Sequence, residues 1–210
     1  MTVTAIIGLG NMGKGLARRL AGKTGLVVAA RDANGAKAFA ATLPAGSVTV
    51  ADPAEAVAKA DIVVLGLPFA AALEFAGKAN LAGKVLVDMT NPVKPDYSGL
   101  ALGHTTSAAE ELQNASPRAR VVKAFNTIFA GLLDAPASQT ADVPVFLAGN
   151  DEAAVDQVAD LVTRAGFAPQ KAGGLEAARL IEPLGMLNIR FAYGLGHGTA
   201  IAPAWVKLAA

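Results

Sequence analysis

A glycine-rich turn near the start of the chain constrains the fold more than any other feature of the sequence. Val3–Ile7 is a continuous apolar run, and residues 8–13 follow it with the spacing G-x-G-x-x-G. Residues 11–21 then repeat apolar side chains at helical spacing. A buried strand that passes through such a turn into a helix is typical of proteins that bind the diphosphate of a dinucleotide.

The positions of this turn have separate physical roles. Gly8 permits the tight turn, and Gly10 lets the backbone approach a diphosphate with no Cβ in the way. Gly13 allows the helix to lie close to the strand. The free amides at the start of the helix, around Asn11 and Met12, would face the phosphates at the positive end of the helix dipole.

Apolar runs alternate with helical patterns along most of the chain. Strands are expected at residues 3–7, 26–30, 48–51, 62–65, 85–87, 121–124, 143–148 and 167–170. Helices are expected at residues 11–21, 33–43 and 53–59, from Ser107 onward, at 153–165, and at 175–187 with a break at Pro183. This order predicts an α/β fold with a doubly wound, mostly parallel Rossmann-type sheet. Residues 1–174 would form the nucleotide-binding domain, and 175–210 a short helical, glycine-rich extension packed on it.

Composition excludes several classes of protein. A hydrophobic fraction of 53% in 210 residues excludes disorder and suits one domain. The absence of cysteine excludes disulfides and thiolate chemistry, and no other metal-ligand pattern is visible. A net charge of +1 favours neither nucleic acid nor a membrane surface as partner. The most apolar stretch, residues 62–73, is too short to cross a bilayer, and no signal peptide is visible, so we expect a cytoplasmic protein.

The end of the second predicted strand bears on which nucleotide is bound. NAD sites place Asp or Glu about 20 residues after the glycine motif to accept a hydrogen bond from the ribose 2′-hydroxyl. This chain has Ala30 at that position, followed by Arg31, whose guanidinium could bind a 2′-phosphate. NADP(H) is therefore favoured. If the strand ended one or two residues later, Asp32 could contact the 2′-hydroxyl, which keeps NAD(H) open.

The chain is poor in groups for acid–base catalysis. Neither Tyr97 nor Tyr193 begins a Tyr-x-x-x-Lys pair, and the two histidines, His104 and His197, are far apart. Such poverty suits hydride transfer between a nicotinamide and a flavin-like ring, where the cofactors carry the chemistry and the protein orients them. We therefore expect no catalytic side chain in the strict sense.

Five segments carry a resemblance to a known family. Residues 6–17, 61–68, 86–92, 121–127 and 145–151 resemble the coenzyme F420-dependent NADP reductase family, and the likeness extends over about residues 3–190. The Lys-Ala-Phe-Asn-Thr segment at 123–127 and the Gly-Asn-Asp segment at 149–151 are more specific than the glycine motif. Both are also similar to the cytosolic reductase domain of six-transmembrane metalloreductases, which passes electrons from NADPH to a flavin.

The resemblance implies roles for individual residues. It assigns the pyrophosphate to Leu9, Gly10, Asn11, Met12 and Gly13, the 2′-phosphate to Arg31, the adenosine side to Leu67 and Pro68, the nicotinamide ribose to Asn91 and Pro92, and the stacked rings to Ala124, Phe125, Asn126 and Thr127. It also implies a homodimer that acts on a small-molecule redox acceptor. Asn126 stands where the F420 enzymes often carry His, so FMN or FAD remains open as the acceptor beside F420.

Two other interpretations stay open. The same poverty of acid–base groups would suit a regulatory or partner module that binds NADP(H) and transfers nothing. A short relative of hydroxyacid or imine dehydrogenases is less favoured, because few residues follow Gly174 to form their long helical domain. The glycine-rich segment 194–199 could form a wall of the acceptor pocket, a connector or a dimer contact, and Trp205 could anchor such a contact.

Overall fold

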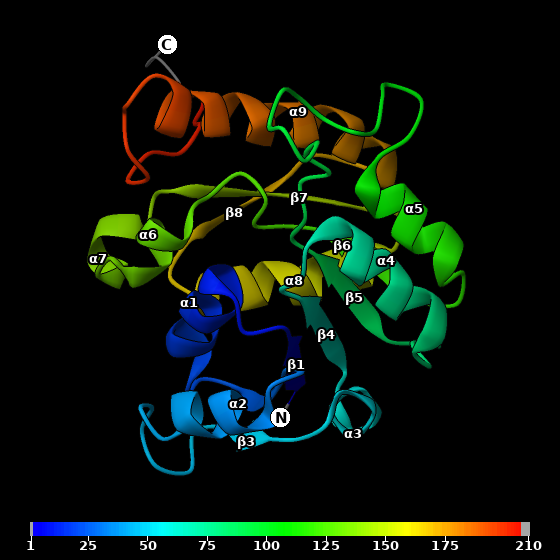
Figure 1. Cartoon of the computed structure of the whole chain (residues 1–210), viewed down its shortest axis with the longest axis vertical. Helices are drawn as coiled ribbons and strands as arrows, with labels where there is room; N and C mark the ends of the chain where they lie inside the picture. Colours follow the sequence, from blue (N-terminus) through cyan, green and yellow to red (C-terminus); the bar gives the residue numbers. More distant parts are fainter. Residues whose placement is uncertain (1, 207–210) are drawn as a thin grey trace.

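The fold is built on one eight-stranded sheet flanked by helices (Figure 1). It is seen in a computed structural model, which describes residues 2–206. The strand order is β3-β2-β1-β4-β5-β6-β7-β8, and every neighbouring pair is parallel except β6 with β7. The strands are β1 (Val3–Ile7), β2 (Gly25–Ala29), β3 (Thr49–Val50), β4 (Ile62–Leu65), β5 (Val85–Asp88), β6 (Arg120–Lys123), β7 (Pro144–Gly149) and β8 (Ala168–Lys171). The predicted doubly wound, mostly parallel α/β fold is confirmed.

Side chains of alternate strand residues enter two separate cores. Ile6, Val64 and Val122 pack with the helices of one face, whereas Ala5, Val63 and Val121 pack with those of the other. Because both faces are covered, the strands are apolar throughout rather than alternating. The first face carries α1 (Asn11–Leu20), α2 (Ala33–Ala40), α6 (Ala130–Asp134) and α8 (Glu152–Arg164), and the second carries α3 (Pro53–Lys59), α4 (Phe69–Lys78) and α5 (Ala108–Ala115).

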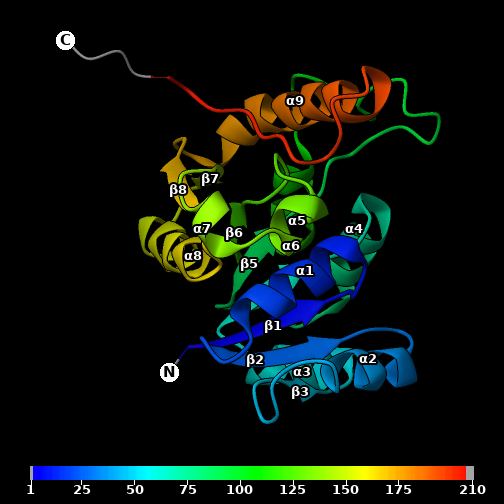
Figure 2. The same cartoon turned by 90° about the vertical axis from the view of Figure 1, so that its left-hand side faces the viewer.

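The C-terminal helix lies across one end of the molecule, beside α5 (Figures 1 and 2). The turn η1 (Leu175–Ala177) leads into α9 (Ala178–Ile189), which continues into the π-helical turn η2 (Arg190–Gly194). Leu175 and Ala178 are buried in the same core as α3–α5, and Ile181 packs on Phe146 of β7. The predicted division of the chain at residue 174 stays a prediction.

The structure corrects the prediction that Pro183 breaks the last helix, because α9 runs through this residue without interruption. Ile181 and Glu182 before it and Gly185 and Asn188 after it are buried, so tertiary contacts hold the helix on both sides of the missing amide. Three helices that the sequence pattern left unassigned also form, namely α4, the short α6 and the short α7 (Ala137–Thr140). The apolar, alanine-rich sequence of α4 hides its helical period.

A search of residues 2–206 finds no helix with both the length and the apolar character needed to cross a bilayer.

Candidate functional site

The glycine turn lies at the carboxyl ends of the parallel strands, where the strand order reverses between β1 and β4. Gly8 has a φ of +100°, and a Cβ there would lie 2.5 Å from the carbonyl oxygen of Gly66. A Cβ at Gly13 would overlap the carbonyl oxygen of Gly8. Gly8 and Gly13 are thus required for the chain to turn and for α1 to approach the sheet.

The N-terminus of α1 is open toward this turn. Gly10 is its N-cap, no side chain caps it, and its first turn holds no acidic residue. A Cβ at Gly10 would meet nothing within 4 Å, so the space above this residue is free. The first amides of a ten-residue helix therefore face open space with the positive end of its dipole, which is a suitable geometry for an anion.

Two cavities meet at this turn. Gly8, Leu9 and Gly10 line a cavity of about 1220 Å³, and Asn11 and Met12 line a second of about 970 Å³. We call the first the β2-side cavity, because it lies along the end of β2, and the second the α9-side cavity, because α9 forms one wall. A molecule bound across the turn would reach into both.

Arg31 and Lys14 line the β2-side cavity together with Leu67 and Pro68. Asp32 also lines it, but its carboxylate caps α2 by accepting a hydrogen bond from the amide of Gly35 at 2.9 Å. Because β2 ends at Ala29, Asp32 lies beyond the strand and serves the following helix. This arrangement favours Arg31, rather than Asp32, as the residue that contacts a ribose substituent.

A carboxylate in the same cavity is already neutralised. Glu74 accepts a hydrogen bond from Lys78 at 2.6 Å, and this bond together with the ammonium charge lowers the pKa of Glu74. In the part of the chain that the structure describes, Arg31 and Lys14 form no ion pair with any carboxylate. The half-buried Lys14 instead lies over the Phe39 ring, 5.8 Å from its centroid. Together with Lys84, which also lines this cavity, the two cations outnumber the Asp32 carboxylate and leave the cavity positive.

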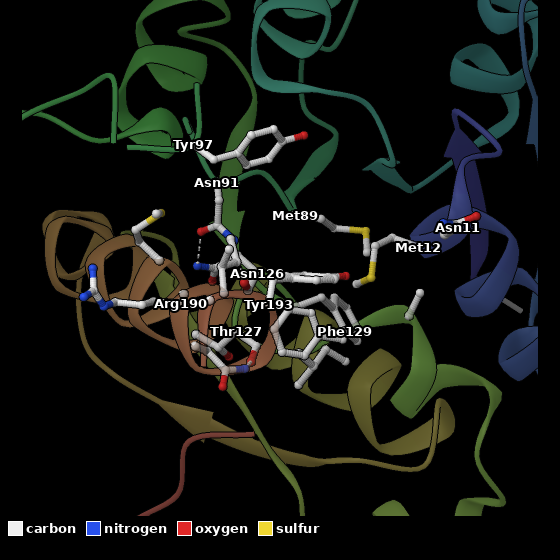
Figure 3. A pocket seen from close by; sticks show the side chains of 18 of the residues that line it. Asn11, Met12, Met89, Asn91, Tyr97, Asn126, Thr127, Phe129, Arg190 and Tyr193 are labelled. Carbon is white, nitrogen blue, oxygen red and sulfur yellow. Dashed lines mark hydrogen bonds between the residues drawn. The ribbon is translucent and has the colours of Figure 1, made fainter. Parts of the chain in front are cut away.

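The α9-side cavity has mainly apolar and amide walls, as Figure 3 shows. Met12 and Met89 lie on one side, and the rings of Phe129 and Tyr193 meet edge to face at a centroid distance of 5.8 Å. Arg190 at the end of α9 is the one lysine, arginine, aspartate, glutamate or histidine among the described residues that line it. Such a cavity can hold a flat ring but offers little acid–base chemistry.

A pair of asparagines forms the back wall of the α9-side cavity (Figure 3). The Asn126 amide donates to Asn91 Oδ1 at 2.9 Å, and the Asn91 amide donates to the Asn126 carbonyl oxygen at 2.7 Å. Asn126 also donates to the carbonyl oxygen of Ile181 at 3.1 Å. The pair therefore joins the segments after β5 and β6 to α9.

Two buried oxygens of this wall have no partner. Asn126 Oδ1 and Thr127 Oγ1 form no hydrogen bond with the described residues, although both side chains are almost fully buried. Phe125, just before them, has a left-handed φ of +63°, a conformation that costs a non-glycine residue about 1–3 kcal/mol. Strained backbone and unpaired polar atoms beside a cavity are typical of a ligand site.

Comparisons with known proteins agree with this geometry. The family described as "NADP oxidoreductase coenzyme F420-dependent" matches residues 3–92. A crystal structure from Arthrobacter sp. FB24, named as a "putative f420 dependent nadp-reductase", is 34% identical and has a TM-score of 0.80. The match covers 93% of this chain and 96% of that chain. The chain belongs to the F420-dependent NADP oxidoreductase family.

Two curated relatives of this family member differ in length. The F420-dependent NADP reductase of Methanocaldococcus jannaschii is 28% identical over 90% of this chain and 91% of that protein. Metalloreductase STEAP3 of Rattus norvegicus is 32% identical over 85% of this chain. The chain spans 35% of that metalloreductase's length, so the match concerns about a third of it.

The structure brings most of the predicted site residues of this family member to the two cavities. The β2-side cavity holds Leu9, Gly10, Arg31, Leu67 and Pro68, and the α9-side cavity holds Asn11, Met12, Asn91, Phe125, Asn126 and Thr127. Pro92 and Ala124 are buried and line neither cavity, and Gly13 acts through its close contact with Gly8. Of the segment 194–199, Gly194 and Leu195 reach the α9-side cavity. Trp205 lies elsewhere, with its ring against Phe146.

Several cavity residues were not predicted from the sequence. Lys14 lies directly after the glycine motif, but its distance along the chain from Arg31 does not indicate that the two side chains line one cavity. Gly185, Ile189 and Tyr193 recur at a spacing of four residues on one face of α9 and η2. That period could have indicated a face, but not which cavity the face would line.

Proposed function

We propose that this chain transfers hydride between NADP(H) and a small-molecule acceptor with a flavin-type ring, either the deazaflavin F420 or FMN or FAD. The observation that carries the proposal is the meeting of two unlike cavities at one glycine turn. The β2-side cavity is positive through Arg31 and Lys14, whereas the α9-side cavity is largely apolar with an amide wall. A phosphorylated adenosine suits the first and stacked rings suit the second.

The nucleotide would be held mainly by backbone and by two cations. The open α1 N-terminus at Asn11 and Met12 would bind the diphosphate, and the guanidinium of Arg31 would bind the 2′-phosphate. Leu67 and Pro68 would contact the adenosine, and Asn91, with Pro92 buried behind it, would adjoin the nicotinamide ribose. The free space above Gly10 supports this fit.

The α9-side cavity would align two rings and keep water from them. With both groups bound, the chemistry that they would supply is hydride transfer, in which NADPH becomes NADP⁺ and the acceptor ring is reduced by two electrons. The amide wall of Asn91 and Asn126 would lie beside the ring edges, whereas Asn126 Oδ1 and Thr127 Oγ1 have almost no exposed surface and lie behind it. Met12 and Met89 supply apolar surface for the ring faces, and Ala124 and Phe125 are fully buried next to them in the core. No acidic side chain is required of the protein for this step.

Purified protein should oxidise NADPH when F420, FMN or FAD is supplied, as followed by the loss of NADPH absorbance. Comparison of the three acceptors at equal concentration would identify the one that is used. Binding of NADPH without turnover on any of them would support the alternative, a regulatory or partner module that only binds NADP(H). Turnover on a ketone or imine without a flavin-type acceptor would support the dehydrogenase-like alternative.

A further inference from the structure

A buried ionic cluster lies directly behind the asparagine pair. Asp88 and Lys123 are register partners at the ends of β5 and β6, and both side chains have no exposed surface. The Lys123 ammonium donates to Asp88 Oδ2 at 2.7 Å, to Glu182 Oε1 of α9 at 2.7 Å, and to the carbonyl oxygen of Thr90 at 2.6 Å. Its three protons therefore have three acceptors.

The two carboxylates are also satisfied. Asp88 Oδ1 accepts from the amide of Thr90 at 2.8 Å, and Glu182 accepts from the first amides of α5, those of Ala108 at 3.0 Å and Ala109 at 3.3 Å. Burial raises the pKa of Glu182, and the nearby Lys123 ammonium opposes this effect. With all three groups ionised the formal charge is −1, and it faces the positive end of the α5 dipole.

Joining two strands and a helix through buried charges has a high free-energy cost. Removing three charged groups from water costs several kcal/mol per ion, and packed apolar side chains often stabilise a protein as well or better. Its stability value alone does not explain why the cluster is present. What it does provide is a defined geometry, because each Lys123 proton has its own acceptor and both carboxylates are also held by backbone amides.

The cluster and the asparagine pair connect the same three segments in adjacent positions. Thr90 immediately precedes Asn91, and Lys123 lies three residues before Asn126. Glu182 immediately follows Ile181, whose carbonyl oxygen accepts from the Asn126 amide. The Lys123 ammonium thus connects these three segments at positions next to the Asn91–Asn126 pair.

We propose that Lys123 is a positioning residue, which holds the segments after β5 and β6 and helix α9 at the spacing that the Asn91–Asn126 pair requires. Lys123 itself does not line the α9-side cavity and would not touch the rings. The effect on ring alignment rests on the proposed function, whereas the placement of the two asparagines in the free protein does not.

The test uses the neutral triple variant Lys123→Met/Asp88→Asn/Glu182→Gln, which removes all three charges at similar side-chain volume. In the free full-length protein, the side-chain NH₂ signals of Asn91 and Asn126 should exchange with solvent about tenfold or more faster than in the wild type. If turnover is measurable, kcat should fall by about tenfold or more while the protein stays folded, because small misplacements of reacting groups are costly. Unchanged asparagine protection in the folded triple variant would overturn the proposal.

The single variant Glu182→Gln keeps the test decisive if the triple variant does not fold. It leaves Lys123 paired with Asp88 and Thr90, and weakens the bonds that Glu182 of α9 forms with Lys123 and with the first amides of α5. The Asn126 NH₂ group, whose acceptor Ile181 lies on α9, should lose protection, and no change there would contradict the proposal.

Arg179→Met is the matched control. It removes another link between α9 and α5, the pair of Arg179 with Glu110, without touching the cluster. Protection of both asparagines should remain at the wild-type level in this variant. Because the exchange measurement needs neither nucleotide nor acceptor, failure of NADPH turnover in the wild type would overturn the proposed function and leave this inference to its own test.

Discussion

Arg31 and Lys14 share the β2-side cavity but are held differently. Arg31 is exposed and forms no hydrogen bond with any residue that the structure describes, so it is free to bind an anion. Lys14 is half-buried and lies against the Phe39 ring, which orients its ammonium without neutralising it. We therefore expect Arg31 to decide between the two nucleotides and Lys14 to add general attraction for phosphate.

Arg31→Ala should weaken NADPH binding and leave NADH binding almost unchanged, because only NADPH carries the 2′-phosphate. At an exposed position the lost charge-assisted bonds are worth about 1–2 kcal/mol, which is on the order of tenfold in Kd. Titration followed by nucleotide fluorescence measures both constants. Arg118→Ala, an exposed arginine at the opposite end of the strands, should change neither. Equal losses for NADPH and NADH would refute the role of Arg31.

Gly185→Ala should disturb the asparagine wall from the other side. A Cβ at Gly185 would lie 2.6 Å from Asn91 Oδ1 and 2.9 Å from the Asn126 carbonyl oxygen, so the pair would have to move. We expect a clear fall in NADPH turnover, measured as kcat and KM. The control is Gly77→Ala in α4, where a Cβ meets nothing within 4 Å and should stabilise the helix by about 0.4–1 kcal/mol. Wild-type kinetics in the Gly185 variant would contradict this account of the wall.

Among the elements, α9 does most to complete the α9-side cavity. Three groups of hydrogen bonds tie it to the rest of the site: Glu182 with Lys123, Ile181 with Asn126, and Asn188 with Thr127; the pair of Arg179 with Glu110 joins it to α5 outside the cavity wall. These contacts also explain why the helix tolerates Pro183. The cavity wall therefore depends on side-chain contacts between elements that are distant in the sequence.

The pair of Glu110 and Arg179 should make part of this attachment pH-dependent. A hydrogen bond from Arg179 holds the pKa of Glu110 below its ordinary value of 4.5. A carboxyl with a lowered pKa in the folded state stabilises the protein above its unfolded pKa, and this contribution disappears as the pH falls through the folded pKa. Arg179→Met should therefore lower Tm near pH 7, and its Tm should approach that of the wild type as the pH falls below 4.5 and through the lowered pKa of Glu110. A Tm difference that stays constant over this range would disprove the linkage.

At the scale of the whole molecule, topology brings the two cavities together. The reversal of strand order between β1 and β4 opens a crevice at the carboxyl ends, and the glycine turn lies in it. A ligand that lies across the turn would therefore contact both halves of the sheet. Buried Arg19 ties α1 to α6 and to the end of α8, because it donates to the carbonyl oxygens of Leu132, Leu133 and Ala165.

Nucleotide binding should accordingly stabilise the entire chain. At a concentration of about 100 times its Kd, NADPH should add about 2.7 kcal/mol and raise Tm by several degrees. NADH at the same concentration should raise Tm less, since it has no 2′-phosphate for Arg31. Thermal unfolding with each nucleotide measures the difference. Equal Tm shifts would mean that the site does not distinguish NADP(H) from NAD(H). No Tm shift with either nucleotide would exclude nucleotide binding at this turn.

The homodimer that the family resemblance implies stays a prediction. Several apolar side chains are exposed on α9, η2 and the C-terminal segment, among them Leu180, Tyr193 and Trp205. Light scattering of the purified protein should give twice the chain mass of 21.1 kDa. A mass of one chain at micromolar concentration would contradict the prediction.

Short-range patterns in the sequence predicted the glycine turn and much of the lining of the β2-side cavity. The apolar run at residues 3–7, the turn at 8–13 and Arg31 just after the second strand lie within one strand–helix–strand unit, where local geometry follows from glycine positions and strand length. The Ser107 cap of α5 is equally local, since Ser107 Oγ accepts from the Glu110 amide. Such features need no knowledge of distant residues.

Only the tertiary structure determined the α9-side cavity and the groups behind it. Lys123, Asp88 and Glu182 have no spacing that links them in the sequence, and they meet because parallel strands in register end at one edge under α9. Gly185 and Asn91 come together in the same way. Local pattern thus specifies the glycine turn and the open N-terminus of α1, whereas the shape of the α9-side cavity arises from side chains that approach one another only after the sheet and its last helix have assembled.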